Sequence, residues 1–98
     1  MIITLCGSTK FKNAFNRISQ RLSLKGHIVL SPNIFSHADN IELTEENFET
    51  LKKVHLDKIA MSDVIVVINV DGYIGETTRE EIEYAEKLNK EIIYLKDQ

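Results

Sequence analysis

The chain has 98 residues, of which 43% are hydrophobic and 28% charged, and its net charge is -3 at pH 7. A chain of this length supports one hydrophobic core, so we expect a single domain over residues 1–98. The longest basic cluster is the pair Lys52 and Lys53, which argues against nucleic acid as a partner. Met1 leads directly into the apolar stretch "IITLC", which lacks the features of a signal peptide, and no apolar run reaches membrane-spanning length. We therefore expect a cytoplasmic protein without a membrane partner.

Four apolar, β-branched stretches predict strands at residues 2–6, 27–30, 63–70 and 91–95. Three stretches of helical periodicity separate them: one at about 9–25, one that begins after Thr44, and one that begins at Thr77 or Thr78. This alternation predicts an α/β domain of the three-layer Rossmann-like (flavodoxin-like) type, with three helices and a four-stranded parallel sheet in the order 2-1-3-4. The unbroken apolar run from Val64 to Ile68 is typical of a central strand covered on both faces.

Each predicted helix carries a stripe of residues that faces the sheet. The stripes are Phe11, Ala14, Phe15, Ile18 and Leu22 in the first helix, Phe48, Leu51, His55 and Ile59 in the second, and Ile82, Ala85 and Leu88 in the third. Gly26 suits the left-handed position after the first helix. One helix on one face and two on the other leave part of the sheet uncovered, which predicts a homodimer or higher homo-oligomer. A twisted sheet covered by long side chains is the alternative.

Two strand-to-helix loops predict a site for an anion. Ligands of open α/β sheets bind beyond the carboxyl ends of the strands, where the strand order reverses. There "CGSTK" and "DGYIGETT" bring glycines and hydroxyl groups to helix starts, whose free N–H groups favour phosphate. The candidate phosphate-binding residues are Gly7, Ser8, Thr9, Lys10, Gly75, Thr77 and Thr78. An ordinary N-cap role for Ser8 or Thr9, and solvation of Lys10, are the alternatives.

The glutamates of the third helix divide by position. Glu83 and Glu86 stand four residues before lysines, in the favourable order for surface ion pairs, and Glu76 and Glu80 lie near the first turn, where the helix dipole favours acids. Glu81 differs, because its neighbours one and two turns later are apolar and place it towards the crevice. Capping boxes, in which Thr77 and Thr78 cap the helix and the glutamate three residues later completes each box, are the alternative.

Three further polar or reactive groups need an interpretation. His55 lies on an otherwise apolar stripe, where a hydrogen-bonded core histidine is the simpler reading. His37 and Asp39, in the long loop 31–43, are metal ligands by type but lack a third partner, so we expect a solvated loop. Cys6 is interpreted as a small apolar residue that ends a buried strand. We therefore predict no metal and no cofactor.

The motifs "CGSTKF", "IAMSDVIVVINV" and "GETTREEIEYA", in this order, resemble the nucleoside 2-deoxyribosyltransferase-like superfamily, which includes deoxynucleoside 5′-monophosphate N-glycosidases. More closely, the chain resembles small bacterial and phage proteins with "CGST" and "GYIGE" motifs. The resemblance implies that Glu81, within "EIEYA", is the carboxylate nucleophile that attacks the sugar C1′. It further implies phosphate contacts at Gly7, Ser8, Gly75 and Thr77.

The chain departs from the pattern of this superfamily at two positions. Many members have an aspartate where this chain has His55, and a tyrosine where it has Thr4. His55 is then the candidate general acid. The resemblance implies a nucleotide-binding protein that cleaves the base–sugar bond of a (deoxy)nucleoside monophosphate, with a small-molecule nucleotide or nucleoside as its partner. A nucleotide-binding sensor or regulatory module without catalysis is the alternative.

Overall fold

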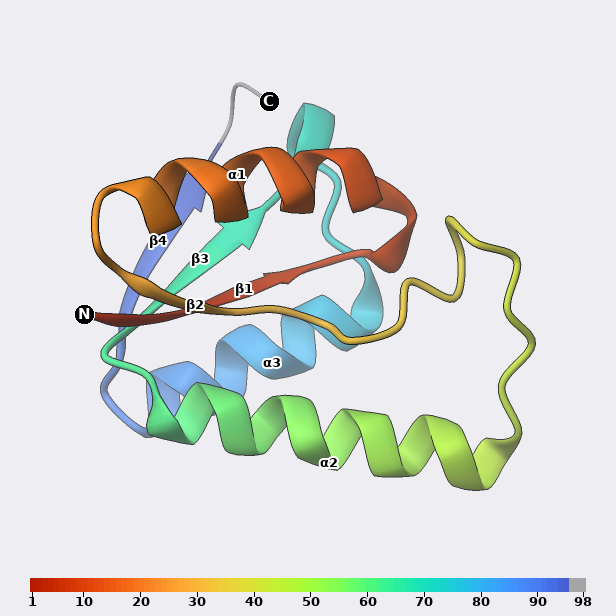
Figure 1. Ribbon diagram of the computed structural model, residues 1–98. Helices are drawn as coiled ribbons and strands as arrows, with labels where there is room; N and C mark the ends of the chain where they lie inside the picture. Colours follow the sequence, from red (N-terminus) through yellow and green to blue (C-terminus); the bar gives the residue numbers. More distant parts are fainter. Residues whose placement is uncertain (96–98) are drawn as a thin grey trace.

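The fold is a parallel sheet between two helical layers, as a computed structural model of the chain shows for residues 1–95 (Figure 1). In chain order the elements are β1 (Ile2–Gly7), a 3-10 turn (Thr9–Phe11), α1 (Lys12–Leu24), β2 (Ile28–Leu30), α2 (Glu45–Met61), β3 (Val64–Ile68), a second 3-10 turn (Val70–Gly72), α3 (Glu76–Lys87) and β4 (Glu91–Leu95). All strand pairs are parallel, and the order is β2-β1-β3-β4. The predicted fold class and strand order are confirmed.

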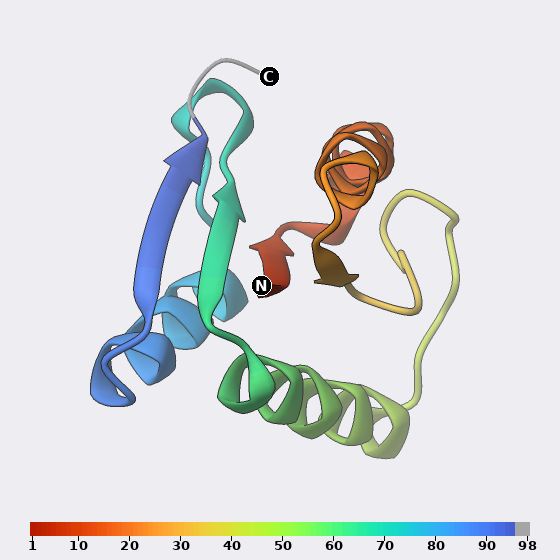
Figure 2. The ribbon, with the colours of Figure 1, turned by 60° about the vertical axis from the view of Figure 1, so that its left-hand side comes forward.

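Different helices cover the two faces of the sheet, α1 on one and α2 and α3 on the other (Figure 2), and each face has its own core. On one face, Ala14, Phe15 and Ile18 of α1 pack on alternate residues of β1 and β3. On the other, Ile59 of α2 and Ile82 of α3 pack on the remaining alternate residues, which include Cys6. Both sets are buried because successive side chains of a strand point to opposite faces. All five residues of β3 are buried, as expected for a central strand.

Two of the four predicted helix limits agree with the structure. Gly26 follows α1 with a φ of +92°, a conformation that favours glycine, and its N–H donates to the Ser23 carbonyl. Thr44 caps α2, because its hydroxyl oxygen accepts a hydrogen bond of 3.0 Å from the Asn47 N–H. The predicted first helix, however, opens with a 3-10 turn, and α1 itself begins at Lys12.

The predicted start of the third helix is wrong. α3 begins at Glu76 with Gly75 as its N-cap, and no side chain caps it. Thr77 and Thr78 therefore lie inside the first turn, so neither capping box forms. The C-terminal end differs as well, since Leu88 is 39% exposed rather than buried.

The expected surface ion pairs of α3 are also absent from the described residues. Lys90 donates instead to the Ala60 carbonyl, and Glu80 forms an ion pair of 3.3 Å with Lys52 of α2. In the described part of the chain, no helix is long and apolar enough to cross a membrane.

Candidate functional site

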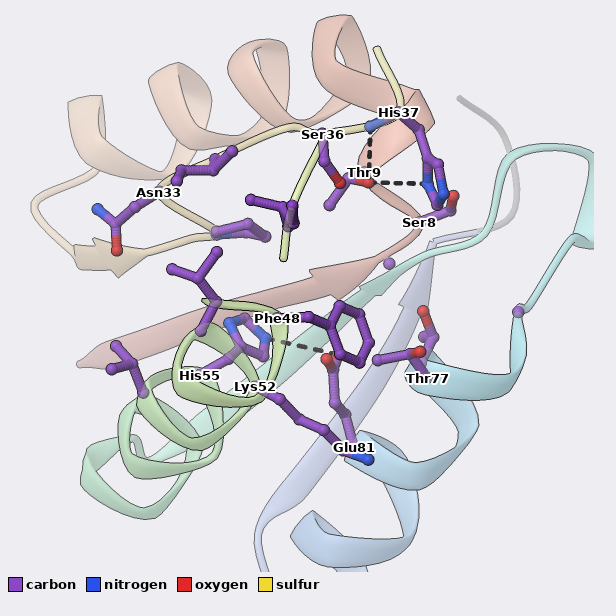
Figure 3. Close-up of a pocket in the computed structure, with 18 of the residues that line it drawn as sticks. Ser8, Thr9, Asn33, Ser36, His37, Phe48, Lys52, His55, Thr77 and Glu81 are labelled. Atoms are coloured by element: carbon purple, nitrogen blue, oxygen red, sulfur yellow. Dashed lines mark hydrogen bonds and ion pairs between the residues drawn. The ribbon is translucent and has the colours of Figure 1, made fainter. Parts of the chain in front are cut away.

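A cavity of about 710 Å³ lies at the carboxyl end of the sheet (Figure 3). Four segments line it: the β1–α1 loop at residues 7–9, the long loop that follows β2, one side of α2, and the chain from Tyr73 to Glu81. Gly7 allows the first of these segments to pass close to β3, since a Cβ atom there would lie 2.7 Å from the Ile68 carbonyl oxygen. The predicted position at the strand ends is thus where the structure has its cavity.

Glu81 lies at the inner wall of this cavity. Glu81 is 8% exposed, and His55 of α2 is 7% exposed. The Oε1 atom of Glu81 lies 3.5 Å from Nε2 of His55. Among the described residues, neither Oε1 of Glu81 nor Nδ1 of His55 has a hydrogen-bond partner. Buried polar atoms without partners are costly, and they concentrate at sites that serve a ligand or a reaction.

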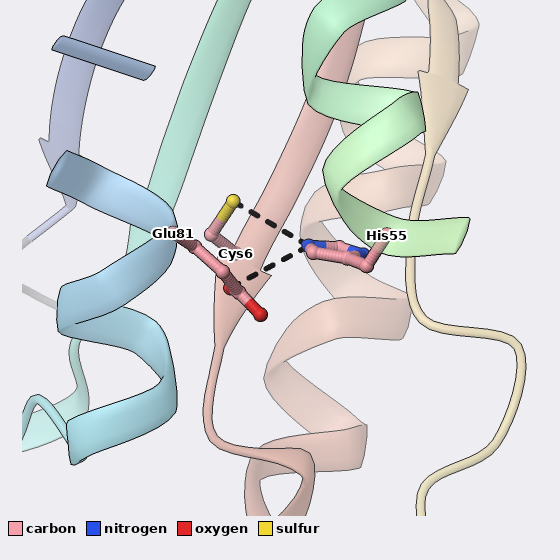
Figure 4. Close-up of side chains that lie close together, drawn as sticks. All are labelled: Cys6, His55 and Glu81. Atoms are coloured by element: carbon pink, nitrogen blue, oxygen red, sulfur yellow. Dashed lines mark hydrogen bonds and ion pairs between the residues drawn. The ribbon is translucent and has the colours of Figure 1, made fainter. Parts of the chain in front are cut away.

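Cys6 completes a buried cluster with these two residues (Figure 4). Its Sγ atom lies 3.6 Å from Nε2 of His55, and one ligand-type atom from each residue lies within 4.8 Å of the others. Sequence interpretation gave Cys6 no role. The available signal was the alternation of β1, which places Cys6 on the same face as Thr4, towards α2.

Burial sets the charges of the cluster. It raises the pKa of Glu81 to about 8, while a hydrogen bond from Cys6 lowers it in part, Glu80 raises it further and Lys52 lowers it. Burial also lowers the pKa of His55 to about 4, with a contribution from the charge of Lys58. The pKa of Cys6 is raised by burial and by Glu81. At pH 7 the acid of Glu81, the imidazole of His55 and the thiol of Cys6 are therefore all mainly neutral.

The long loop after β2 makes exposed contacts with the first loop and with the start of α1. Thr9 and Nδ1 of His37 are 2.9 Å apart, and Lys12 forms an ion pair of 2.9 Å with Asp39. These contacts tie the loop to the start of α1, and His37 and Asp39 remain exposed, as expected for a solvated loop. Among the described residues, His37 and Asp39 do not belong to a group of side chains spaced to hold a metal ion.

A family model for a domain of unknown function, DUF4406, matches residues 4–94. The chain belongs to the DUF4406 family. No curated protein matched it. Among solved structures, the DUF4406 domain is similar to a chain described as "2-desoxiribosyltransferase from Leishmania mexicana", with 19% identity and a TM-score of 0.71. The match covers 97% of this chain and 63% of that chain. At this identity the similarity establishes the fold, and the DUF4406 domain spans less than two thirds of that protein's length.

The DUF4406 domain brings most of the predicted site residues together. The cavity lining includes both predicted catalytic residues and six of the seven predicted phosphate-binding residues: Glu81, His55, Gly7, Ser8, Thr9, Gly75, Thr77 and Thr78. Lys10 is the exception. Lys10 does not line the cavity itself, but its Nζ atom lies 3.7 Å from the ring centroid of Tyr73, which does.

Other members of the site had no clear sequence signal. Phe48 belongs to the predicted apolar stripe of α2, but it is 42% exposed and lines the cavity because the N-terminal part of α2 extends past the sheet (Figure 1). Lys58 also lines the cavity, where its ammonium group donates to the Ser31 carbonyl and the Asn33 side chain. Thr4 is fully buried and forms hydrogen bonds with the Ser62 hydroxyl and the Lys58 carbonyl.

Proposed function

We propose that this domain binds a nucleoside or nucleotide and cleaves its N-glycosidic bond, with Glu81 as the nucleophile. The observation that carries the proposal is a buried carboxyl group that lines a cavity at the carboxyl ends of parallel strands. The sequence resemblance selects the same residue. The structural neighbour is described as a deoxyribosyltransferase, and the shared fold supports a related reaction.

The reaction has two steps. The Glu81 carboxylate attacks the sugar C1′ as the bond from C1′ to the base breaks, and the base leaves with the bonding electrons and takes up a proton. Water then attacks C1′ of the glycosyl ester, releases the sugar and restores Glu81. His55 is neutral at pH 7 and acts here as a positioning residue for the carboxylate. Its lowered pKa argues against the predicted role as general acid.

The first experiment incubates the chain with a panel of deoxynucleosides and their 5′-monophosphates and measures free base by chromatography. We expect base release, and we expect Glu81→Gln to lower it more than about 1000-fold because the amide cannot form the ester. Glu83→Gln, an exposed neighbour on the same helix, is the matched control and should retain the wild-type rate. Base release that survives Glu81→Gln contradicts the proposal.

The pH dependence distinguishes the role of Glu81. A nucleophile must be ionised, and its pKa is about 8 in the free chain, so kcat/KM should rise with pH up to about 8 and then level off. A rate that falls over this range would instead indicate that protonated Glu81 acts as an acid.

A nucleotide-binding sensor without catalysis is the second candidate function. It is favoured by the neutral state of both Glu81 and His55 at pH 7. In that case a nucleotide raises the melting temperature of the chain, but no base is released at any pH.

A further inference from the structure

Three elements place a sulfur, a nitrogen and an oxygen atom around one point. Cys6 comes from β1, His55 from α2 and Glu81 from α3, and Figure 4 shows their side chains converging. Each of these three residues is more than nine-tenths buried. Oε1 of Glu81 has no hydrogen-bond partner among the described residues, although it is buried and faces the other two side chains.

The spacing of these atoms matches a tetrahedral zinc ion. Zinc bonds of about 2.3 Å to sulfur and about 2.0 Å to nitrogen and oxygen separate neighbouring ligand atoms by roughly 3.3 to 3.6 Å. The Sγ atom of Cys6 lies 3.6 Å from Nε2 of His55, and Oε1 of Glu81 lies 3.5 Å from the same nitrogen. Two of the three separations therefore already have tetrahedral values, and all three ligand atoms lie within 4.8 Å of one another.

The charges of this ligand set suit a divalent cation. A bound thiolate and carboxylate carry two negative charges, and the imidazole is neutral, so Zn²⁺ would make the buried site neutral overall. Without a cation, ionised Cys6 and Glu81 would lie side by side in a poorly solvated position, which is unfavourable. Thiolate and imidazole ligands also favour zinc over magnesium or calcium, which prefer oxygen.

We propose that Cys6, His55 and Glu81 form a three-ligand Zn²⁺ site. His55 and Glu81 line the cavity, whereas Cys6 does not, so the fourth coordination position is open towards the cavity and accessible to water or to a donor atom of a ligand. This site does not depend on the proposed glycosidic cleavage. Zinc occupies the carboxylate that the cleavage needs, so zinc binding and nucleophilic attack by Glu81 exclude each other.

The test uses Co²⁺ as a spectroscopic probe and Zn²⁺ as a competitor, with the chain kept reduced. Cys6 is the only cysteine of the chain, so a thiolate-to-cobalt charge-transfer band reports on Cys6 directly, without any variant. We expect this band, with visible bands of tetrahedral intensity, and we expect Zn²⁺ to abolish both. Zn²⁺ alone should raise the melting temperature. Absence of the charge-transfer band at saturating Co²⁺ overturns the proposal.

Variants localise the site. Cys6→Ser and His55→Asn should each weaken Zn²⁺ binding by more than about 100-fold, whereas His27→Gln, a histidine remote from the cavity, should bind like wild type. Far-UV circular dichroism establishes that each variant is folded. Zinc affinity unchanged in folded Cys6→Ser would also overturn the proposal.

The two proposals fail separately. Base release is measured with the chelator-treated chain, and metal binding is measured without nucleotide. Base release without metal binding leaves the glycosidase proposal standing and removes the zinc site. Metal binding without base release supports the zinc site and removes the glycosidase proposal.

Discussion

Glu81 and His55 are both neutral at pH 7 because burial moves their pKa values in opposite directions. The pKa of Glu81 rises to about 8, and that of His55 falls to about 4. Each shift disfavours the charged form, so the folded chain bears a cost for holding these two groups out of water. Such a cost is typical of a functional site, where a ligand or a metal ion recovers it.

This arrangement predicts an unusual loss of stability at mildly alkaline pH. Between about pH 4.5 and 8 the folded chain holds a proton on Glu81 that the unfolded chain has lost, so stability falls as pH rises. Below about pH 6.5, His55 opposes this trend, because there the unfolded chain binds the extra proton. From pH 6.5 to 8 the contribution of Glu81 is unopposed within this pair, and stability should fall by up to about 1.4 kcal/mol per pH unit.

Urea unfolding at a series of pH values measures this slope. Glu81→Gln should remove it and should be more stable than wild type at pH 8, because the amide has no charged form to desolvate. Glu83→Gln should keep the wild-type slope. Equal slopes in wild type and Glu81→Gln between pH 6.5 and 8 would show that the Glu81 carboxyl is not shielded from solvent as described.

At the scale of elements, α2 connects the sheet to the cavity. Its C-terminal part packs on the sheet through Ile59, and its N-terminal part extends past the sheet, where Phe48 faces the cavity. Since the N-terminal turns have less packing to stabilise them, their order depends more on the Thr44 cap. The cap thus fixes the point where the long loop ends and the cavity wall formed by α2 begins.

Thr44→Ala should lower the free energy of unfolding by about 1 kcal/mol, whereas Thr44→Ser should have little effect because serine retains the hydroxyl acceptor. Hydrogen exchange of the amides at residues 45–48 should accelerate in the alanine variant. Thr50→Ala is the matched control, since the Thr50 hydroxyl donates to the Glu46 carbonyl within an exposed stretch of the same helix. A larger loss in Thr50→Ala than in Thr44→Ala would contradict this account.

At the scale of the whole molecule, the sheet is unevenly covered. Val66 of β3 is buried under α1, but its partner in the next strand, Ile93, is 41% exposed on the same face. α1 lies over the part of the sheet formed by β2, β1 and β3 (Figure 2). The edge strand β4 therefore keeps an apolar side chain open to a partner, which agrees with the predicted homo-oligomer without testing it.

Light scattering coupled to size exclusion measures the oligomeric state. We expect a dimer whose dissociation is promoted by Ile93→Lys, because a charge would then be buried in the interface. Met61→Lys changes a more exposed hydrophobic residue at the end of α2 and should leave the dimer intact. A wild-type chain that runs as a monomer at all concentrations contradicts the prediction.

Local patterns determined most of the fold. The β-branched stretches and the helical periods predicted every strand and helix of the described chain, because hydrophobic periodicity depends on near neighbours. Thr44 and Gly26 were predicted for the same reason, since caps act within one turn. The start of α3 was mispredicted because Gly75, Thr77 and Thr78 offer competing starts, and the helix begins at Glu76, with Gly75 as its N-cap.

The contacts that make up the site were decided by tertiary structure. The sequence by itself selected Glu81 through its helical position and marked His55 as a polar residue on an apolar stripe. Their contact with each other and with Cys6 joins three elements. Cys6 and His55 are 49 residues apart in the sequence, and His55 and Glu81 are 26 residues apart. Strand order, helix packing and burial bring them within reach, and burial sets their charges. Local sequence carries no signal for either effect, because both depend on distant segments that exclude water together.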